Sequence, residues 1–384
     1  MIGAGVIGTG FIGPAHIEAL RRLGNVEVVA LAESSQATAD VKARALHVSR
    51  AYGDWRDLVR DPAIQVVHNC TPNNLHHQIA MATIAAGKHI VAEKPLAMTS
   101  TETGELVQAL SATNLVGAVC FNYRMYPLVQ EARVRTAAGE LGELRLIHGC
   151  YLQDWLLYDT DYNWRVDARL AGASRAMADI GSHWCDLAQF VARRRITAVC
   201  ADLATFLSRR RRPKGDVETF AGADRSALAT TIEVDVETED CGSLLLAFEG
   251  GARGSCIISQ ISAGHKNHLQ LEVDGSLGSL AWNQEQPTEL WMGQRGGPNR
   301  LLPKDPSLLS ETARRYAHYP GGHGEAYPDS ITNLLARVYA FIGEARDPRR
   351  EEPDFPSFDD GHRSALIVET ILASHRTRGW MPVP

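Results

Sequence analysis

Lys94 is the residue whose type and position point most directly to chemistry. It follows a short apolar run at 90–92 that is typical of a strand, and Pro95 cannot extend that strand. A lysine at the carboxyl end of a strand in an α/β domain enters the crevice where ligands bind. Burial beside an oxidised nicotinamide, which is cationic, would lower the pKa of Lys94 and let it act as an acid or base. A lone lysine after a strand is more often an exposed surface residue, so this role depends on a nearby cofactor site.

Asp179 and His183 form a second candidate pair. Their spacing of four places them on one face of a helix predicted over 180–192. The opposite face carries an apolar stripe of four residues, Ile180, Trp184, Leu187 and Val191. We expect the stripe to anchor the helix in the core, and the carboxylate to orient the imidazole and raise its pKa. A surface ion pair that only braces the helix is the alternative.

A metal site fits these residues less well. Asp186 extends the polar stripe of Asp179 and His183, whereas His76 and His77 lie elsewhere in the chain. No fourth ligand is fixed by this arrangement, and hydride transfer needs no metal. We therefore expect no metal.

Gly8, Gly10 and Gly13 follow an apolar run at 2–7 and open a helical pattern. In this context G-x-G-x-x-G is typical of a dinucleotide site: the first glycine forms the tight turn, the second admits the pyrophosphate, and the third lets the helix pack closely. The helix N-terminus, with Phe11 and Ile12, offers N–H groups to phosphate. A glycine turn in some other α/β protein is the alternative.

Glu33 favours NAD over NADP. It ends the next strand, twenty residues after Gly13, and is followed by Ser34 rather than an arginine. A carboxylate there accepts hydrogen bonds from the ribose hydroxyls of NAD and would repel the 2′-phosphate of NADP. Further cofactor contacts are expected after the strand at 66–70, from Thr71, Pro72, Asn74 and His76. Asn74 also suits the cap of the helix that follows.

Composition excludes several classes of protein. The chain has 384 residues, 45% hydrophobic and 22% charged, and a net charge of −6, which gives no general attraction to nucleic acid or anionic membrane. No apolar run approaches a membrane span, no secretory signal is apparent, and seven scattered cysteines suit a reducing cytoplasm. We expect a cytoplasmic protein with a small-molecule substrate.

Two α/β domains are predicted. Residues 1–122 alternate short apolar runs with helical patterns, which predicts a doubly wound Rossmann sheet. Residues 123–384 carry longer strands with turn signals, which predicts an α/β domain with a large, mainly antiparallel open sheet. The irregular stretch 154–178 offers aromatic faces and polar groups suited to a sugar ring, although an ordinary packed loop is as consistent. The arginine run at 209–212 is interpreted as a solvated loop.

The combined motifs resemble the Gfo/Idh/MocA family of oxidoreductases across the whole chain. They are Gly8-x-Gly10-x-x-Gly13, Thr71-Pro72 with His76, Glu93-Lys94-Pro95, and Asp179-Ile180-Gly181-Ser182-His183. The resemblance implies Lys94, Asp179 and His183 as the catalytic set, and a homodimer or homotetramer formed through the open sheet face. One departure is Ala171-Gly172-Ala173-Ser174, where many members are richer in glycine.

The resemblance also implies further site residues. The cofactor set would gain Glu93, Lys94, Asn122, Trp164 and Arg165. The substrate set would combine the catalytic residues with Arg124, Tyr126, Tyr158, Asn163 and His323. The segment Gly321-Gly322-His323-Gly324-Glu325-Ala326-Tyr327-Pro328 looks like members that oxidise sugars or glycosides, some at the ring C3 hydroxyl.

These observations predict an NAD-dependent dehydrogenase of a sugar, glycoside or cyclic polyol. Lys94 or His183 would take the hydroxyl proton while hydride moves to the nicotinamide. One rival is a glycosidase that uses tightly held NAD for transient oxidation. The other is a non-catalytic sugar-sensing regulator, which would have no need of Lys94, Asp179 and His183 together.

Overall fold

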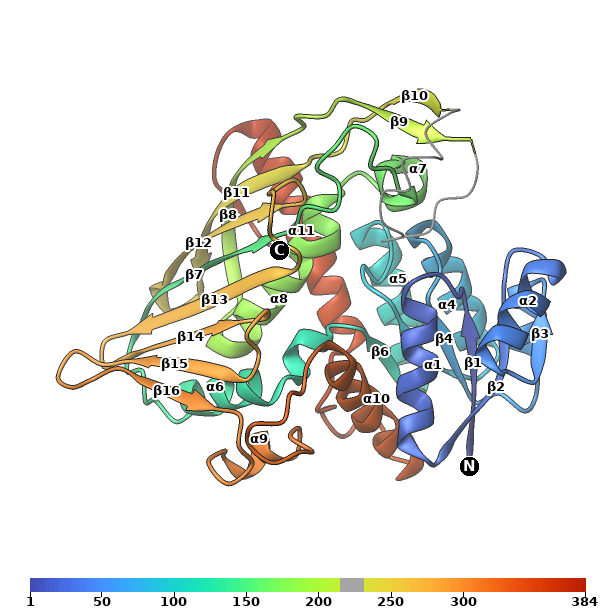
Figure 1. The fold of residues 1–384 in the computed structure, drawn as a ribbon, viewed down its shortest axis with the longest axis horizontal. Coiled ribbons are helices and arrows are strands. Elements are labelled where there is room, and N and C mark those ends of the chain that lie inside the picture. Colours follow the sequence, from blue (N-terminus) through green and yellow to red (C-terminus); the bar gives the residue numbers. More distant parts are fainter. Residues whose placement is uncertain (215–230) are drawn as a thin grey trace.

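Two large sheets organise the described part of the molecule, one in each half of the chain (Figure 1). The structure is a computed structural model that describes residues 1–214 and 231–384. A fully parallel sheet forms the N-terminal half, and a larger mixed sheet forms the C-terminal half. The α/β class predicted for both halves is confirmed.

The N-terminal sheet is a doubly wound parallel sheet with strand order β3-β2-β1-β4-β5-β6. Its strands are β1 (Ile2–Ile7), β2 (Val26–Ala32), β3 (Arg50–Tyr52), β4 (Val66–Asn69), β5 (His89–Ala92) and β6 (Gly117–Val119). Its helices are α1 (Ile12–Leu23), α2 (Gln36–Leu46), α3 (Trp55–Arg60), α4 (His76–Ala85) and α5 (Ser100–Ser111). The order reverses at β1 and β4, so the carboxyl ends of these strands meet at the point where such sheets bind ligands.

The C-terminal sheet has nine strands in the order β16-β15-β14-β13-β7-β12-β11-β8-β17. Only β7 and β12 pair in parallel. The strands are β7 (Leu144–Leu152), β8 (Ile196–Ala204), β11 (Cys241–Phe248), β12 (Arg253–Ser259), β13 (His268–Gly275), β14 (Ser279–Asn283), β15 (Glu289–Gly293), β16 (Arg300–Pro303) and β17 (Met381–Pro382). The helices are α6 (Pro127–Ala137), α7 (Ala168–Ala171), α8 (Ser182–Ala192), α9 (Glu311–Arg314), α10 (Tyr327–Gly343) and α11 (Phe358–Thr377).

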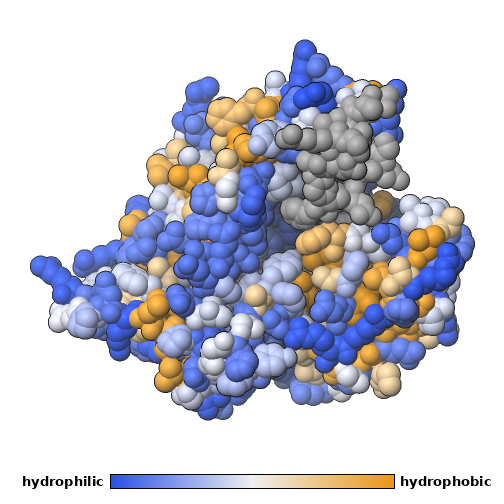
Figure 2. All heavy atoms as spheres, in the orientation of Figure 1, coloured by the Kyte–Doolittle hydropathy of each residue, from blue (hydrophilic) through white to orange (hydrophobic). Residues whose placement is uncertain are grey.

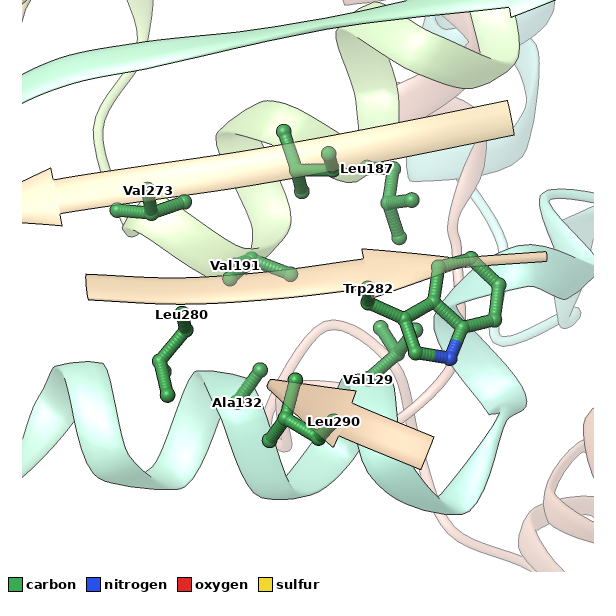
Figure 3. A pocket seen from close by; sticks show the side chains of 9 residues that line it. Val129, Ala132, Leu187, Val191, Val273, Leu280, Trp282 and Leu290 are labelled. Carbon is green, nitrogen blue, oxygen red and sulfur yellow. The ribbon is translucent and has the colours of Figure 1, made fainter. Parts of the chain in front are cut away.

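The core of the C-terminal half lies between this sheet and α6 and α8. Figure 3 shows apolar side chains from both helices facing strand residues across a cavity of about 10 Å³. They are Val129, Ala132, Leu187 and Val191 from the helices, and Leu271, Val273, Leu280, Trp282 and Leu290 from the strands. The space is at the lower limit of what one bound water needs and has almost no polar lining, so it is a packing gap and no ligand site.

Helix α10 returns from the C-terminal part of the chain to the N-terminal half. It packs beside α1, and Ile331, Leu334, Val338 and Tyr339 share a core cluster with Val6 and other residues of the parallel sheet. The N-terminal half therefore does not form its core alone, because a segment beyond residue 122 completes that core. The boundary at 122 itself stays a prediction.

The arginine run at 209–212 is not a solvated loop. It forms β9 (Arg209–Pro213), which pairs antiparallel with β10 (Thr231–Asp235). Alternate side chains of a strand face opposite sides, and Arg210 faces inward with 0% exposure. It pairs with Asp240 at 2.9 Å and donates to the carbonyls of Leu156, Tyr158 and Asp161. The buried partner Asp240, far along the sequence, is what the charge run could not reveal.

Candidate active site

Lys94 and Asp179 meet where the two halves of the chain join. Lys94 follows β5, and its Nζ lies 2.7 Å from Asp179 Oδ1 and 3.0 Å from the Asp179 carbonyl oxygen. The two side chains are only 12% and 14% exposed. Figure 2 shows the face of Figure 1 hollowed where the halves meet, with hydrophilic residues along one side of the hollow. The structure therefore brings together two of the three predicted catalytic residues as an ion pair.

Asp179 is the centre of a polar cluster. Besides Lys94, its carboxylate accepts hydrogen bonds from Arg165 Nε at 3.2 Å and Gln260 Nε2 at 2.8 Å. Burial alone would raise the pKa of Asp179, but the charges of Lys94 and Arg165 outweigh burial and hold that pKa well below its usual value. Asn163 Oδ1 in turn accepts from the backbone N–H and Nη1 of Arg165. Asp179 thus stays ionised and fixes the position of the Lys94 ammonium.

The helix that carries these residues begins irregularly. Met177–Gly181 form a π-helical turn that leads into α8. The predicted apolar stripe is buried, since Ile180, Trp184, Leu187 and Val191 are at most 3% exposed. The opposite face is enclosed as well, because His183 is only 6% exposed.

His183 behaves differently from the sequence-based expectation. Its carboxylate neighbour Asp179 was expected to raise its pKa, and this is wrong. Burial, followed by the charge of Lys94, lowers the pKa of His183 to about 3, so the imidazole is uncharged at neutral pH. The Asp179 carboxylate instead accepts hydrogen bonds from Lys94, Arg165 and Gln260. Among the described residues, His183 Nδ1 is buried without a hydrogen-bond partner.

Aromatic rings fix the orientation of the His183 ring. Tyr123 and Phe121 meet it edge-on at 4.8 and 5.8 Å between centroids, and Tyr151 is tilted at 6.5 Å. A closed ring of hydrogen bonds links the hydroxyls of Tyr123 and Tyr151 at 2.7 Å and joins both to the Asn267 side chain. Sequence reasoning missed these residues and Gln260, because segments far apart in the chain supply them and no local motif marks them.

The glycine loop is shaped for a dinucleotide. Gly8 has φ of 86°, a region that favours glycine, and a Cβ at Gly13 would lie 2.2 Å from the Gly8 carbonyl oxygen. Both therefore have the turn and packing roles predicted for them. A Cβ at Gly10 would meet nothing within 4 Å among the described residues, so the backbone there is open to an approaching group. Phe11, 51% exposed, and Ile12 stand beside this opening at the start of α1.

Glu33 is bonded to the glycine loop. Its Oε1 accepts hydrogen bonds from the backbone N–H and the hydroxyl of Thr9, both at 2.6 Å. Its Oε2 faces the Ser34 backbone N–H at 3.4 Å. The loop therefore holds the carboxylate at the carboxyl end of β2, where a ribose is expected. An NAD molecule fits this set of an open backbone, a helix N-terminus and a fixed carboxylate.

The loop after β4 is held by His76. Its ring nitrogens lie 2.9 Å from the Thr71 carbonyl oxygen and 2.7 Å from that of Pro95, so it ties this loop to the Lys94-Pro95 turn. Asn74 does not cap α4 as the sequence allowed. Within the described part of the chain its Oδ1 is buried and unpartnered, which leaves it available to a bound group.

The other predicted cofactor residues are held by hydrogen bonds or ring contacts with their neighbours. Glu93 Oε2 accepts the Lys94 backbone N–H at 3.2 Å. The Arg165 guanidinium lies 4.4 Å above the Trp164 ring. Asn122 is buried and donates to the Ser330 hydroxyl at 2.8 Å.

The structure does not bring Arg124 or Tyr126 to Lys94. Arg124 pairs with Asp186 and Asp360 and lines a different cleft of about 1280 Å³. Tyr126 is 1% exposed and packs between Tyr123 and Trp282. Their positions do not support the substrate role predicted for them, because buried partners unseen in the sequence occupy both side chains.

The remaining predicted substrate residues are split between core and surface. Asn163 is buried beside Arg165, whereas Tyr158 is 61% exposed. His323 is exposed at a loop tip, with Nδ1 3.3 Å from the Gly321 carbonyl oxygen. In the same segment, Tyr327 lies closer to the site, with its ring 6.3 Å from Tyr123.

A Rossmann sheet with an open phosphate loop, beside a buried lysine, aspartate and histidine, defines a nicotinamide-dependent oxidoreductase. Sequence comparison agrees. The model described as "Oxidoreductase family, NAD-binding Rossmann fold" matches residues 2–121, and the "GFO/IDH/MocA C-terminal domain" matches residues 129–281. Levoglucosan dehydrogenase of Pseudarthrobacter phenanthrenivorans is 31% identical, with 100% of this chain and 98% of that protein covered.

Solved structures give the same result. Levoglucosan dehydrogenase in complex with NADH and L-sorbose is 29% identical, with a TM-score of 0.90 and coverage of 100% of this chain and 99% of that one. An inositol dehydrogenase homolog complexed with NAD+ from Azotobacter vinelandii is 28% identical, with a TM-score of 0.85 and coverage of 99% and 97%. The chain belongs to the Gfo/Idh/MocA family, and it is an NAD-dependent dehydrogenase. In the part of the chain that the structure describes, no helix has both the length and the apolar character to cross a bilayer.

Proposed function

We propose that the enzyme oxidises a secondary hydroxyl of a sugar, glycoside or cyclic polyol, and that Lys94 handles the hydroxyl proton. The observation that carries this proposal is the placement of Lys94 Nζ. It is held by Asp179 at 2.7 Å, in a nearly buried position at the join between the cofactor half and the sheet half. A general acid or base must have such a fixed position to work efficiently.

The residues divide the work by their charge. NAD, when bound, accepts the hydride. In the free enzyme Lys94 is an ammonium paired with Asp179. Once this ammonium has released its proton to solvent, the neutral Nζ takes the hydroxyl proton, and the ionised Asp179 stabilises the ammonium that forms again. His183 is uncharged, and its unpartnered Nδ1 is suited to a hydrogen bond with a sugar oxygen. A base with a pKa of about 3 would bind a proton weakly at neutral pH, which favours Lys94 over His183 for proton transfer.

The sugar class is supported by relatives and by the site. Levoglucosan dehydrogenase has been solved with levoglucosan and with L-sorbose, and a myo-inositol 2-dehydrogenase of Thermotoga maritima is 24% identical over 94% of this chain. Around His183 this chain offers hydroxyl and amide groups on Tyr123, Tyr151 and Asn267 beside aromatic ring edges. Such groups match the hydroxyls and apolar faces of a sugar ring. We further propose the ring C3 hydroxyl as the position oxidised, because the segment Gly321–Pro328 looks like that of family members that oxidise sugars or glycosides, some of them at this position.

A substrate screen tests this proposal. Sugars, anhydro sugars, glycosides and inositols are incubated with enzyme and NAD, and with NADP in parallel, while NADH absorbance is followed. We expect net NADH formation with at least one member and a ketone product located by NMR. Glycosidic cleavage without net NADH would favour the glycosidase, and saturable binding without turnover would favour the regulator.

We also propose that the open face of the nine-stranded sheet joins copies of this chain into a homodimer or homotetramer. Leu245 and Ile257 project from neighbouring strands on that face and are 52% and 55% exposed. Large apolar side chains that share an exposed sheet face are typical of an interface. Light scattering of the wild type and of Ile257→Glu tests this: a stable oligomer should dissociate in the variant, and a monomeric wild type would contradict it.

A further inference from the structure

Behind Lys94, a chain of four polar side chains runs through the N-terminal core. His16 Nε2 lies 3.1 Å from Glu93 Oε1, and His16 Nδ1 lies 2.9 Å from His68 Nδ1. His68 Nε2 lies 2.9 Å from the Tyr339 hydroxyl. His16 and His68 are 0% exposed and Tyr339 is 1% exposed. The four residues come from α1, β4, α10 and the turn after β5. Their hydrogen bonds therefore link helix α10 to Glu93, the residue that precedes Lys94.

The charges of Glu93 and His68 can be assigned. Burial raises the pKa of Glu93, but the hydrogen bond from His16 and the nearby positive charge outweigh burial and bring that pKa to about 2, so the carboxylate is ionised and only accepts. Burial lowers the pKa of His68 well below its usual value, so His68 is neutral. Burial also lowers the pKa of His16, whereas a thiolate at Cys70 or Cys120 would raise it; burial raises the pKa of both thiols, so they are uncharged at neutral pH and do not hold a second proton on His16.

Two proton arrangements satisfy all three contacts, and in both of them His16 donates from Nε2 to the Glu93 carboxylate. In one, His16 also donates from Nδ1 to His68, which donates from Nε2 to the Tyr339 oxygen. In the other, the Tyr339 hydroxyl donates to His68 Nε2, and His68 donates from Nδ1 to a neutral His16. The thiol of Cys120 lies 3.6 Å from His16 Nε2, and burial raises the pKa of that thiol to about 12, so it is uncharged.

A buried, ionised carboxylate needs an explanation beyond stability. Replacing a buried ion pair with packed apolar residues is often neutral or stabilising, because buried charges lose their hydration. Here the carboxylate leads to the site: Glu93 uses Oε1 for His16 and Oε2 for the Lys94 backbone N–H. Fixing the carboxylate therefore fixes the backbone that presents the Lys94 side chain.

We propose that His16, held in turn by His68 and Tyr339, is a positioning residue for the reaction: by donating from Nε2 it locks the Glu93 carboxylate, and through it Lys94, in the reactive geometry. This role rests on the function proposed above for Lys94. The proton on His16 Nε2 does not depend on that function and can be measured without turnover.

Nitrogen NMR of the wild type with 15N-labelled histidine tests the proton arrangement. We expect Nε2 of His16 to stay protonated from pH 6 to pH 9, and His68 to stay neutral. A neutral His16 that carries its proton on Nδ1 alone would overturn the proposal. So would stoichiometric zinc in the purified protein, because His16, Glu93 and Cys120 are also spaced as metal ligands. This result stands whether or not Lys94 proves catalytic.

His16→Gln tests the effect on catalysis, with the best substrate from the screen. Gln can still donate to Glu93, but it lacks the second ring nitrogen that His68 holds, so the carboxylate is no longer fixed. We expect kcat to fall by about 10- to 100-fold with KM within about twofold, as small misplacements of reacting groups do. The matched control is His89→Gln on β5. The His89 ring accepts the Val116 N–H and is not part of the hydrogen-bond chain from Glu93 to Tyr339, so this variant should keep kcat. Folded His16→Gln with wild-type kcat would refute the role.

Tyr339→Phe covers the case in which His16→Gln does not fold. It removes only the oxygen that His68 contacts and keeps the ring in the core. We expect a shifted His68 nitrogen resonance and a severalfold lower kcat, with Tyr316→Phe in the same core cluster as control. Unchanged resonances together with unchanged kcat would refute the proposed role of this hydrogen-bond chain.

Discussion

Asp179 forms its ion pair with Lys94 and forms none with His183, although His183 is its neighbour on the same helical segment. Lys94 Nζ contacts both the carboxylate and the carbonyl oxygen of Asp179. One residue from each half of the chain therefore defines the catalytic point. The histidine stands beside this pair as an uncharged group, and this division of charge leads to the following predictions.

Cofactor choice should depend on Glu33. Glu33→Ser removes the carboxylate, so we expect weaker binding of NAD and relief of the repulsion of NADP. The ratio of kcat/KM for the two cofactors measures the effect. Thr9→Val is the matched control, because it removes one hydrogen bond to Glu33 without changing its charge, and the ratio should stay NAD-selective. A wild type that prefers NADP would show that the ribose assignment is wrong.

His183→Asn should lower kcat/KM without removing a limb of the pH–rate profile near pH 6.5. Burial lowers the pKa of His183 to about 3, so the free enzyme's His183 does not titrate near neutrality. The variant loses a ring that orients the substrate, and the buried apolar stripe should preserve the fold. A limb near pH 6.5 in the wild type that vanishes in the variant would contradict the neutral-imidazole assignment. If the variant unfolds while its folded fraction keeps normal activity, His183 is structural.

The same residue should shape acid stability. In the unfolded chain His183 binds a proton near its usual pKa of 6.5, whereas the folded protein resists this until about pH 3. Stability should therefore fall as pH falls below 6.5, by up to about 1.4 kcal/mol per pH unit. The low pKa values of Asp179 and Glu93 act at lower pH, because their contribution is lost only below about pH 4.5. Denaturation of wild type and His183→Asn between pH 5 and pH 6.5 isolates the histidine, and equal slopes would argue against it.

Arg210→Met should destabilise the protein by about 3–5 kcal/mol, because it leaves the buried Asp240 short of a partner and frees three carbonyls of the 156–161 loop. Arg209→Met is the control from the same strand, since Arg209 is 67% exposed and should cost less than about 0.5 kcal/mol. Urea unfolding measures both. Similar losses for the two variants would mean that β9 packs differently.

The parallel sheet and the glycine loop were predictable because local sequence carries them. Glycines at 8 and 13 are required by backbone geometry. The environment of His183 was not predictable, because burial and the cation at Lys94 set its pKa, and both come from residues distant in sequence. A helical spacing of four also misled, since the π-helical turn at Met177–Gly181 changes which neighbours Asp179 meets.

The roles of Arg124 and Arg210 show the same limit. The local sequence around each arginine is equally consistent with a ligand site, a solvated loop or a buried ion pair. Asp186, Asp360 and Asp240 decide between these cases, and each comes from a different part of the chain. Sequence spacing predicts contacts within one element well and contacts between elements poorly.

The turnover of Lys94→Ala tests the central claim most directly. With saturating NAD and the best substrate from the screen, NADH formation should fall by about 10²–10⁴-fold, as expected for loss of a general acid–base group. Titration of cofactor fluorescence should show that NAD still binds. Lys94→Arg should also be inactive although it can still pair with Asp179, because arginine does not release its proton. A Lys94→Ala enzyme that keeps most of its kcat would remove Lys94 from the mechanism and contradict the account.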